Sequence, residues 1–247
     1  MKTSVASVGY PKGMAEDYGC VIDHELFLQQ IKSWGATLVG VGDVREGLVR
    51  EFWHLPVAIS LAIAHPPVKE CIVTKDFVAA YTNQFPVIDA RLENIQKRMV
   101  SFLRSVGWKA FEIPPDSDKQ DPRFVARLFH LFPHKTAATC SGLGWVGKNG
   151  LLVTKEYGAR LSWATVLTDA PLKVSTDPYL EGQCNSCNRC VGVCPAKAIS
   201  SEEWVRGSIG QTKIKAKACA RQLKKNYETV GSYICGLCIT ACPLSRR

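Results

Sequence analysis

The sequence has no long hydrophobic run. No segment approaches the roughly 20 consecutive apolar residues that a membrane-spanning helix needs. The first ten residues also lack the apolar stretch that forms the centre of a secretion signal. An apolar fraction of 46% over 247 residues is enough to bury one large core or two modest ones. We therefore expect a globular, cytoplasmic protein with no membrane contact.

Two further signals are missing. The sequence shows no internal repeat of solenoid length. Its 11 cysteines are not spread as in a small disulfide-stapled secreted domain, because eight of them lie between residues 184 and 242. This concentration at regular spacings indicates ligands for metal in a reducing compartment.

The first cysteine motif extends from Cys184 to Pro195 with the spacing C-x2-C-x2-C-x3-C-P. In bacterial ferredoxins such a run gives three thiolates to one [4Fe-4S] cluster, and its fourth cysteine ligates a second cluster. A second run, from Cys235 to Pro243, has the spacing C-x2-C-x3-C-P. Together the two runs predict two [4Fe-4S] clusters.

The same crossing rule divides the cysteines into two ligand sets. The predicted ligands of the first cluster are Cys184, Cys187, Cys190 and Cys242. The second cluster lacks its usual fourth ligand, because Ser232 occupies the position three residues before Cys235. Cys219 is the remaining cysteine of this region, on a predicted basic helix over 213–227, and we assign it to the vacancy. The predicted ligands of the second cluster are Cys194, Cys219, Cys235 and Cys238.

A pair of zinc sites is the alternative interpretation, since zinc also binds four thiolates. Zinc ribbons have paired C-x2-C knuckles, whereas the longer run followed by proline favours iron and sulfur. Two oxidised clusters of charge about −2 each would lower the formal charge from +9 to about +5. Such a mildly basic protein gives little reason to expect nucleic acid as a partner, and an anionic cofactor or protein remains possible.

Helical and strand patterns alternate in the first 170 residues. Asp23 is expected to cap a helix whose buried side includes Leu26, Phe27, Ile31 and Trp34. Apolar residues at steps of three and four predict another helix between Ile88 and Val106. Strands are predicted over 36–41, 56–64, 108–113, 151–154 and 160–168.

The composition changes over residues 169–178, where we place a domain boundary. We expect an α+β cofactor-binding domain over 1–176 and a double-cluster domain over 177–247. The polar, proline-broken segment 114–122 is predicted to be a binding loop or lid.

The segment Gly142 to Lys148 has the spacing G-x-G-x-x-G, which also occurs in dinucleotide-binding proteins. That function requires a strand before the turn and a helix after it, and here the predicted order is reversed, so we reject it. The glycines still allow backbone to approach a ligand or a strand closely. Lys148 is either a surface lysine or a contact to an anionic group, and the preceding His134 and Lys135 are either a solvated helix start or a proton donor and anion clamp.

The run from Lys135 to Asn149, followed by Thr168-Asp169 and by the double-cluster motif with its displaced Cys219, resembles epoxyqueuosine reductases and, more distantly, the corrinoid reductive dehalogenases. The resemblance implies a nitroreductase-like mixed-sheet domain that binds cobalamin, followed by a ferredoxin-like domain. Cobalt would then receive the electrons of the clusters. The cofactor-binding residues that it implies are Gly142, Leu143, Gly144, Trp145, Gly147 and Lys148.

Two departures from that family limit the substrate. Its members have a catalytic aspartate fourteen residues before the first glycine of the turn, where this chain has Leu128. A basic residue seven positions further on is matched by Lys135. The tRNA-reading helical repeats that follow the clusters in the family are also missing, so we expect a shortened, divergent relative for which tRNA is not the substrate.

Two functions follow from these patterns. In the first, a cobalamin-dependent reductase acts on an unidentified substrate, with Lys135 or His134 near the reacting face. In the second, an electron-transfer module reactivates a corrinoid enzyme or another partner and has no substrate chemistry of its own. A flavin in place of the corrin is a third possibility. Each would need a low-potential electron donor such as a ferredoxin or flavodoxin.

Overall fold

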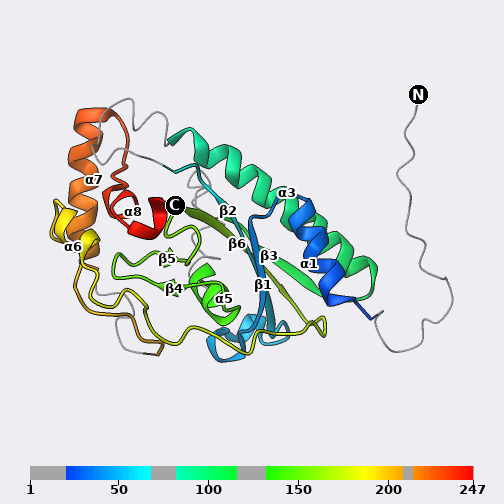
Figure 1. Ribbon diagram of the computed structural model, residues 1–247. Helices are drawn as coiled ribbons and strands as arrows, with labels where there is room; N and C mark the ends of the chain where they lie inside the picture. Colours follow the sequence, from blue (N-terminus) through cyan, green and yellow to red (C-terminus); the bar gives the residue numbers. More distant parts are fainter. Residues whose placement is uncertain (1–20, 68–81, 116–131, 208–213, 247) are drawn as a thin grey trace, which may run out of the picture.

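The computed structural model describes residues 21–67, 82–115, 132–207 and 214–246. Its centre is a four-stranded antiparallel sheet in the order β1-β2-β6-β3 (Figure 1). The strands are β1 (Leu38–Asp43), β2 (Val57–Ala64), β3 (Ala110–Ile113) and β6 (Leu161–Thr168). The α+β class predicted from the sequence is confirmed, and every strand pairing in the described residues is antiparallel.

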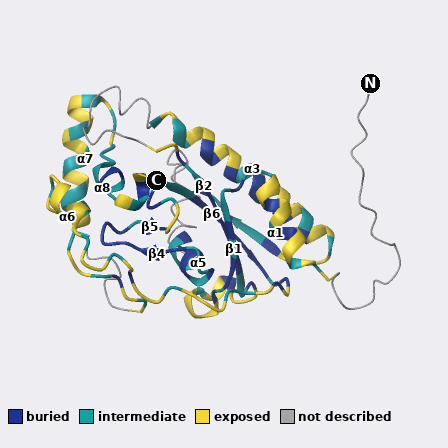
Figure 2. Cartoon of the chain, in the orientation of Figure 1, coloured by how far each residue is buried: buried dark blue, intermediate teal, exposed yellow. Residues whose placement is uncertain are grey.

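Helices cover both faces of this sheet. Helices α1 (His24–Ser33) and α3 (Gln84–Ser105) lie along one face, and α5 (His134–Cys140) lies against the other (Figure 1). Successive side chains of a strand point to opposite faces, so Ile59 and Leu61 of β2 pack with α1 and α3. Ala58 and Ala62 pack on the side of α5. Because both faces are covered, the middle of β2 is buried without interruption (Figure 2).

The two predicted helices of the first half are confirmed, with one error in detail. The carboxylate of Asp23 accepts a hydrogen bond from the backbone N–H of Leu26 at 3.0 Å and so caps α1. Phe27 and Ile31 are buried. Leu26 is 60% exposed, because its side chain lies on the side of the first helical turn that faces away from the sheet. In α3 the residues Leu92, Ile95 and Met99 form the buried stripe that the periodicity indicates.

The remaining elements lie beyond the sheet. Two short 3-10 helices, Arg45–Gly47 and Arg50–Phe52, connect β1 to β2. A small hairpin of β4 (Trp145–Val146) and β5 (Leu152–Val153) lies between α5 and the cysteine-rich segment (Figure 1). That segment contains α6 (Arg189–Val193), α7 (Ala216–Val230), α8 (Leu237–Thr240) and a final 3-10 turn, Pro243–Arg246.

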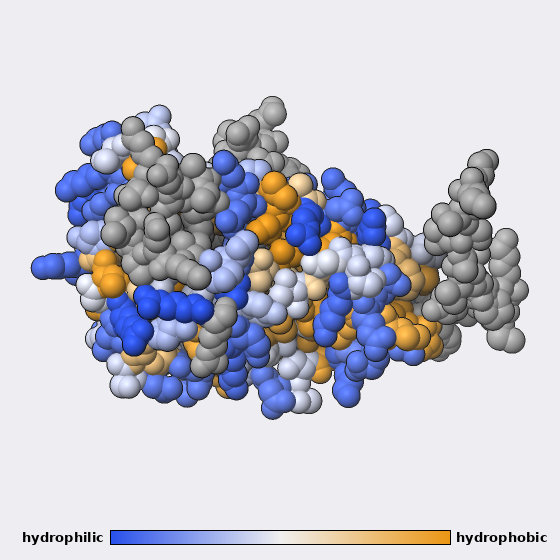
Figure 3. Space-filling view, turned by 45° about the horizontal axis from the view of Figure 1, so that its top comes forward, coloured by the Kyte–Doolittle hydropathy of each residue, from blue (hydrophilic) through white to orange (hydrophobic). Residues whose placement is uncertain are grey.

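The surface gives no sign of a membrane-spanning element. Among the described residues, none of the helices combines the length and the apolarity needed to cross a bilayer. In the view of Figure 3, hydrophilic side chains predominate, and apolar ones reach the surface as separate patches. The predicted loop 114–122 falls mostly outside the described residues, as does Leu128.

Candidate iron-sulfur centre and adjoining cavity

The cysteine-rich segment packs on the small β-hairpin. Trp145 and Val153 of the hairpin form an apolar cluster with Cys184, Ile239 and Cys242. Helix α6 contacts α8, and Gly231, with φ of 75°, ends α7 in the left-handed conformation and turns the chain back toward α8. Local motifs separated by fifty residues are thereby brought together. The nine described cysteines are all free thiols.

The first predicted ligand set is close together in the structure. The pKa of the Cys190 thiol is raised to about 11, first by burial and then by the neighbouring Cys184, Cys187 and Cys242. Burial also raises the pKa of Cys184, while the backbone N–H of Lys148 lowers it. Hydrogen-bond donors aimed at a thiolate are the environment that cluster sulfurs receive in proteins.

The second predicted set is close together in the same way. Burial raises the pKa of Cys238 to about 12, and Cys235, Cys190, Cys219 and Cys194 contribute in the same direction. Burial and then Cys194 and Cys235 raise the pKa of Cys219, which α7 presents from its inner side. The backbone N–H of Ala198 donates to the sulfur of Cys194 at 3.3 Å. Since Cys190 of the first set interacts with Cys238 of the second, the two sets adjoin.

The described residues contain no preformed site for a single metal ion. A zinc ion holds its four sulfurs at about 2.3 Å and therefore close to one another. Within the part of the chain that the structure describes, no three His, Cys, Asp or Glu side chains converge on one such point. Eight thiols in two adjoining sets are the number that two [4Fe-4S] clusters with four cysteine ligands each require.

The raised thiol pKa values predict that the iron-free protein loses stability in alkali. Unfolded cysteines ionise near their ordinary pKa of 9.0, whereas Cys190 and Cys238 stay protonated in the fold until about 11 and about 12. The stabilisation is complete below pH 9 and is lost as the pH rises through these values. Urea unfolding of the iron-free protein should show a lower midpoint at pH 10.5 than at pH 7.5.

The control for this alkaline loss is the conservative variant Cys190→Ser. Removing one thiol should make the loss of stability between the two pH values smaller, because serine does not titrate in this range. Equal pH dependence of the wild type and the variant would contradict a contribution from Cys190.

A cavity of about 720 Å³ opens on the other side of β4. Its walls come from both parts of the chain: the turn after β1, the start of α5, and the segments around residues 178–180 and 204–207. The volume falls in the range of small-molecule and cofactor sites. Its charged and titratable lining residues are Asp43, Arg45, Glu46, His134, Lys135, Cys140 and Arg206.

Arg206 joins the two walls of this cavity, and nothing in the sequence pattern indicated it. Its guanidinium donates to the hydroxyl of Thr139 at 2.7 Å and to the carbonyl of Tyr179 at 3.0 Å. Its Nε is buried with no hydrogen-bond partner among the described residues. Arg45 is paired with Asp43, so that pair contributes little net charge. The sequence analysis missed Arg206, Arg45 and Asp43 as cavity residues, because single charged residues without a characteristic spacing give no sign of the site to which they belong.

Of the two predicted catalytic residues, His134 is fully engaged with the protein. The side chain is 5% exposed, and its Nδ1 lies 2.8 Å from the hydroxyl oxygen of Thr165. Its Nε2 lies 2.9 Å from the carbonyl oxygen of Pro114, which must accept, so Nε2 carries the proton. This arrangement fixes the tautomer and gives His134 a structural role at the start of α5. Lys135 is half-buried and lines the cavity.

The six residues predicted to bind the cofactor do not line this cavity. Trp145 and Lys148 contact the first cysteine loop, whereas the others pack mainly on neighbouring strands and turns. A Cβ at Gly144 would lie 2.4 Å from the carbonyl oxygen of Val153, so this glycine admits a strand and not a ligand. Gly142 has φ of 69° and lies against Ser175 and Asp177, Leu143 packs toward Gly40, and Gly147 packs on Val153. The rings of Trp145 and Tyr179 pack at a tilted angle of 46°, with centroids 5.6 Å apart.

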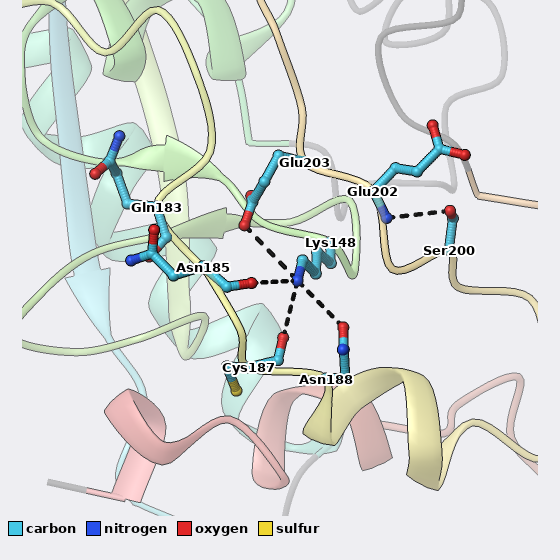
Figure 4. Close-up of polar contacts among 8 residues, drawn as sticks. All are labelled: Lys148, Gln183, Asn185, Cys187, Asn188, Ser200, Glu202 and Glu203. Carbon is cyan, nitrogen blue, oxygen red and sulfur yellow. Dashed lines mark hydrogen bonds and ion pairs between the residues drawn. The ribbon is translucent and has the colours of Figure 1, made fainter.

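Lys148 points into the first cysteine loop (Figure 4). Its side chain is 3% exposed. Its ammonium donates to the carbonyl oxygens of Asn185 at 2.6 Å and Cys187 at 3.2 Å, and to the side-chain oxygen of Asn188 at 3.1 Å. Of the two interpretations considered for this lysine, the surface position is therefore wrong. The anionic neighbour is a protein carboxylate, Glu203, at 3.8 Å.

These features define the class of the protein: an α+β domain joined to a double iron-sulfur cluster domain. Residues 183–245 match the family described as the 4Fe-4S double cluster binding domain. The prediction of two [4Fe-4S] clusters is thereby confirmed at the level of the domain.

In sequence, the chain is similar to epoxyqueuosine reductases. It is 32% identical over 120 residues to the epoxyqueuosine reductase of Lactococcus garvieae, and the match covers 44% of this chain and 31% of that protein. The chain thus spans about a third of this curated relative. The epoxyqueuosine reductase structure from Streptococcus thermophilus has a TM-score of 0.60 at 17% identity, covering 92% of this chain and 67% of that one. The resemblance predicted from the motifs is confirmed.

Two other solved structures share the fold. A reductive dehalogenase, described with a mechanism for B12-dependent dehalogenation, has a TM-score of 0.61 at 19% identity. The match covers 94% of this chain and 34% of the dehalogenase chain. An epoxyqueuosine reductase bound to an epoxyqueuosine-modified tRNA-Tyr stem loop has a TM-score of 0.54 at 19% identity and covers 90% and 64%. At these identities the likeness shows the fold.

Proposed function

We propose that this chain is an iron-sulfur oxidoreductase that passes electrons through two [4Fe-4S] clusters to a corrinoid bound in the cavity, for the reduction of a substrate not yet identified. The observation that supports this most strongly is the thin partition between the two sites. Trp145 contacts Cys184 of the first ligand set, and Val146, the next residue of β4, lines the cavity. A cofactor in the cavity would be separated from the first cluster by a single strand.

The cavity lining suits a ligand with amide and phosphate groups, as cobalamin has. Arg206 offers a buried, unpaired N–H, and Lys135 adds a second cation. Thr136 and Thr139 supply hydroxyls at the same wall. Residues of both walls would hold the corrinoid, and it would supply a metal that accepts electrons one at a time. Val146 and Leu180 add apolar surface to the lining.

The ligand sets are part of the proposal. The first cluster is assigned to Cys184, Cys187, Cys190 and Cys242, and the second to Cys194, Cys219, Cys235 and Cys238. What supports the assignment is the mutual influence of the thiols within each set. The electrostatic interaction between Cys190 and Cys238 supports a path from the second cluster to the first. A low-potential ferredoxin or flavodoxin is the proposed donor, and the cytoplasm the proposed compartment.

A second function is favoured by His134. Because both of its ring nitrogens are bound within the protein, it is not a ready proton donor for a substrate. The sequence also has Leu128 where epoxyqueuosine reductases have their aspartate. Both observations fit an electron-transfer module that reactivates a corrinoid partner.

For the reductase function, an epoxyqueuosine-modified stem loop is the first substrate to assay, since a structural neighbour binds one.

Cobalamin titration tests the proposed cofactor. Anaerobically purified protein should bind cobalamin and alter its visible spectrum, and Thr136→Trp should weaken that binding by at least about tenfold because the indole occupies the cavity. Thr229→Trp, at an exposed position of α7, is the matched control and should bind normally. If cobalamin leaves the spectrum unchanged and a flavin binds instead, the corrinoid proposal is wrong.

A further inference from the structure

A buried cation lies directly beneath the first cluster-binding loop. The loop closes around the ammonium of Lys148, which takes two of its carbonyl oxygens and one side-chain amide as acceptors (Figure 4). Asn185 turns its carbonyl toward this ammonium with φ of 50°, a left-handed conformation that asparagine tolerates better than most residues. The backbone of the loop is thus shaped around a charge supplied by the hairpin of the other domain.

The negative charge opposite Lys148 is the carboxylate of Glu203. Both carboxylate oxygens of Glu203 are buried and have no hydrogen-bond partner among the described residues, and one lies 3.8 Å from the Lys148 ammonium. A Cβ at Gly182 would lie 2.0 Å from that carboxylate, so any larger residue there would displace the carboxylate from this position. A carboxylate without hydrogen bonds is costly to bury, and here its nearest counter-charge is the Lys148 ammonium.

We propose that Lys148 and Glu203 form a charge pair that orients the first cluster-binding loop and sets the reduction potential of the cluster held there. The proposal rests on the proposed function, because it requires that cluster. Reduction adds one negative charge to the cluster. A cation against the loop carbonyl of Cys187 stabilises the reduced form, and a carboxylate that interacts with Cys184 destabilises it. The two residues act with opposite signs.

Opposite signs make the test specific. Lys148→Met keeps the length of the side chain and removes the positive charge, so the first cluster should become harder to reduce. Glu203→Gln keeps the shape and removes the negative charge, so the same cluster should become easier to reduce. Each variant should change the equilibrium constant for one-electron reduction on the order of tenfold. The second cluster should keep its potential.

The measurement is a redox titration of the iron-loaded protein followed by electron paramagnetic resonance, with iron analysis of every variant. Lys155→Met, at an exposed position between β5 and β6, is the control and should leave both potentials unchanged. A purely structural role would reduce iron content or shift both variants in one direction. Shifts of the same sign, or none in either variant, would overturn the charge-pair proposal.

The outcome separates this inference from the proposed function. If the wild type binds no cluster iron after reconstitution, the proposed function is wrong. The charge-pair proposal is then wrong with it, because there is no cluster whose potential the pair could set. If Lys148→Met fails to assemble the first cluster, Glu203→Gln decides alone: a raised potential supports the pair, and an unchanged potential excludes it.

Discussion

Replacing Cys219 with alanine is expected to remove one cluster and leave the other, so bound iron should fall from about eight to about four atoms per chain. Cys194 and Cys235 shift the pKa of Cys219, and Cys219 in turn shifts the pKa of Cys238. All three of these neighbours belong to the second ligand set. The second cluster would lose its fourth thiolate, while all four ligands of the first remain. Iron and sulfide analysis after anaerobic reconstitution measures the result.

The matched control is Cys140→Ala. Cys140 is also a half-buried free thiol, but it lies on the cavity side at the end of α5. Burial raises its pKa, and its charged neighbours are Arg206, Asp43 and Glu46, not the cluster cysteines. The control should retain about eight iron atoms. Equal iron content in the two variants would disprove the assignment of Cys219 as the displaced ligand.

Gly144→Ala is expected to destabilise the protein by about 1–3 kcal/mol or more and to impair cluster assembly with it. The added Cβ would lie 2.4 Å from the carbonyl oxygen of Val153, and backbone of a paired strand cannot move aside cheaply. Separation of β4 from β5 would disturb the apolar cluster that supports Cys184 and Cys242.

Urea unfolding and iron content measure the effect of Gly144→Ala together. Gly192→Ala, in α6, is the control, because a Cβ there meets no atom within 4 Å. The control should unfold at the wild-type urea concentration and bind the same amount of iron. Wild-type stability of Gly144→Ala would show that the hairpin tolerates the side chain and is not the rigid support inferred for the clusters.

Local patterns were sufficient for the regular elements. The period of α3, the cap of α1 at Asp23, and the aliphatic runs of β2 and β6 each depend on neighbours a few residues away, and all were predicted correctly. Leu26 was placed on the wrong side of its helix because the choice depends on where the sheet lies. Segment ends, such as β1 at Leu38–Asp43 against a predicted 36–41, shifted for the same reason.

The glycine turn shows where sequence reasoning reaches its limit. Spacing alone indicated that backbone approaches something closely at Gly142, Gly144 and Gly147, and this is correct. It could not indicate whether that neighbour is a ligand or another strand. In the fold the neighbours are Val153, Ser175 and Asp177, so the turn packs against protein and does not line the cavity.

The sequence by itself determined that the chain has two iron-sulfur motifs and an α+β domain before them, because thiolate spacing and apolar periodicity are local properties. It also predicted that Cys219 is the displaced ligand. Only the tertiary structure decided that Arg206 closes a cavity against α5, that His134 is held by Thr165 and Pro114, and that Lys148 meets Glu203 beneath the first cluster loop. These contacts join residues 20 to 67 positions apart, and buried charges acquire their partners only when the core has formed around them.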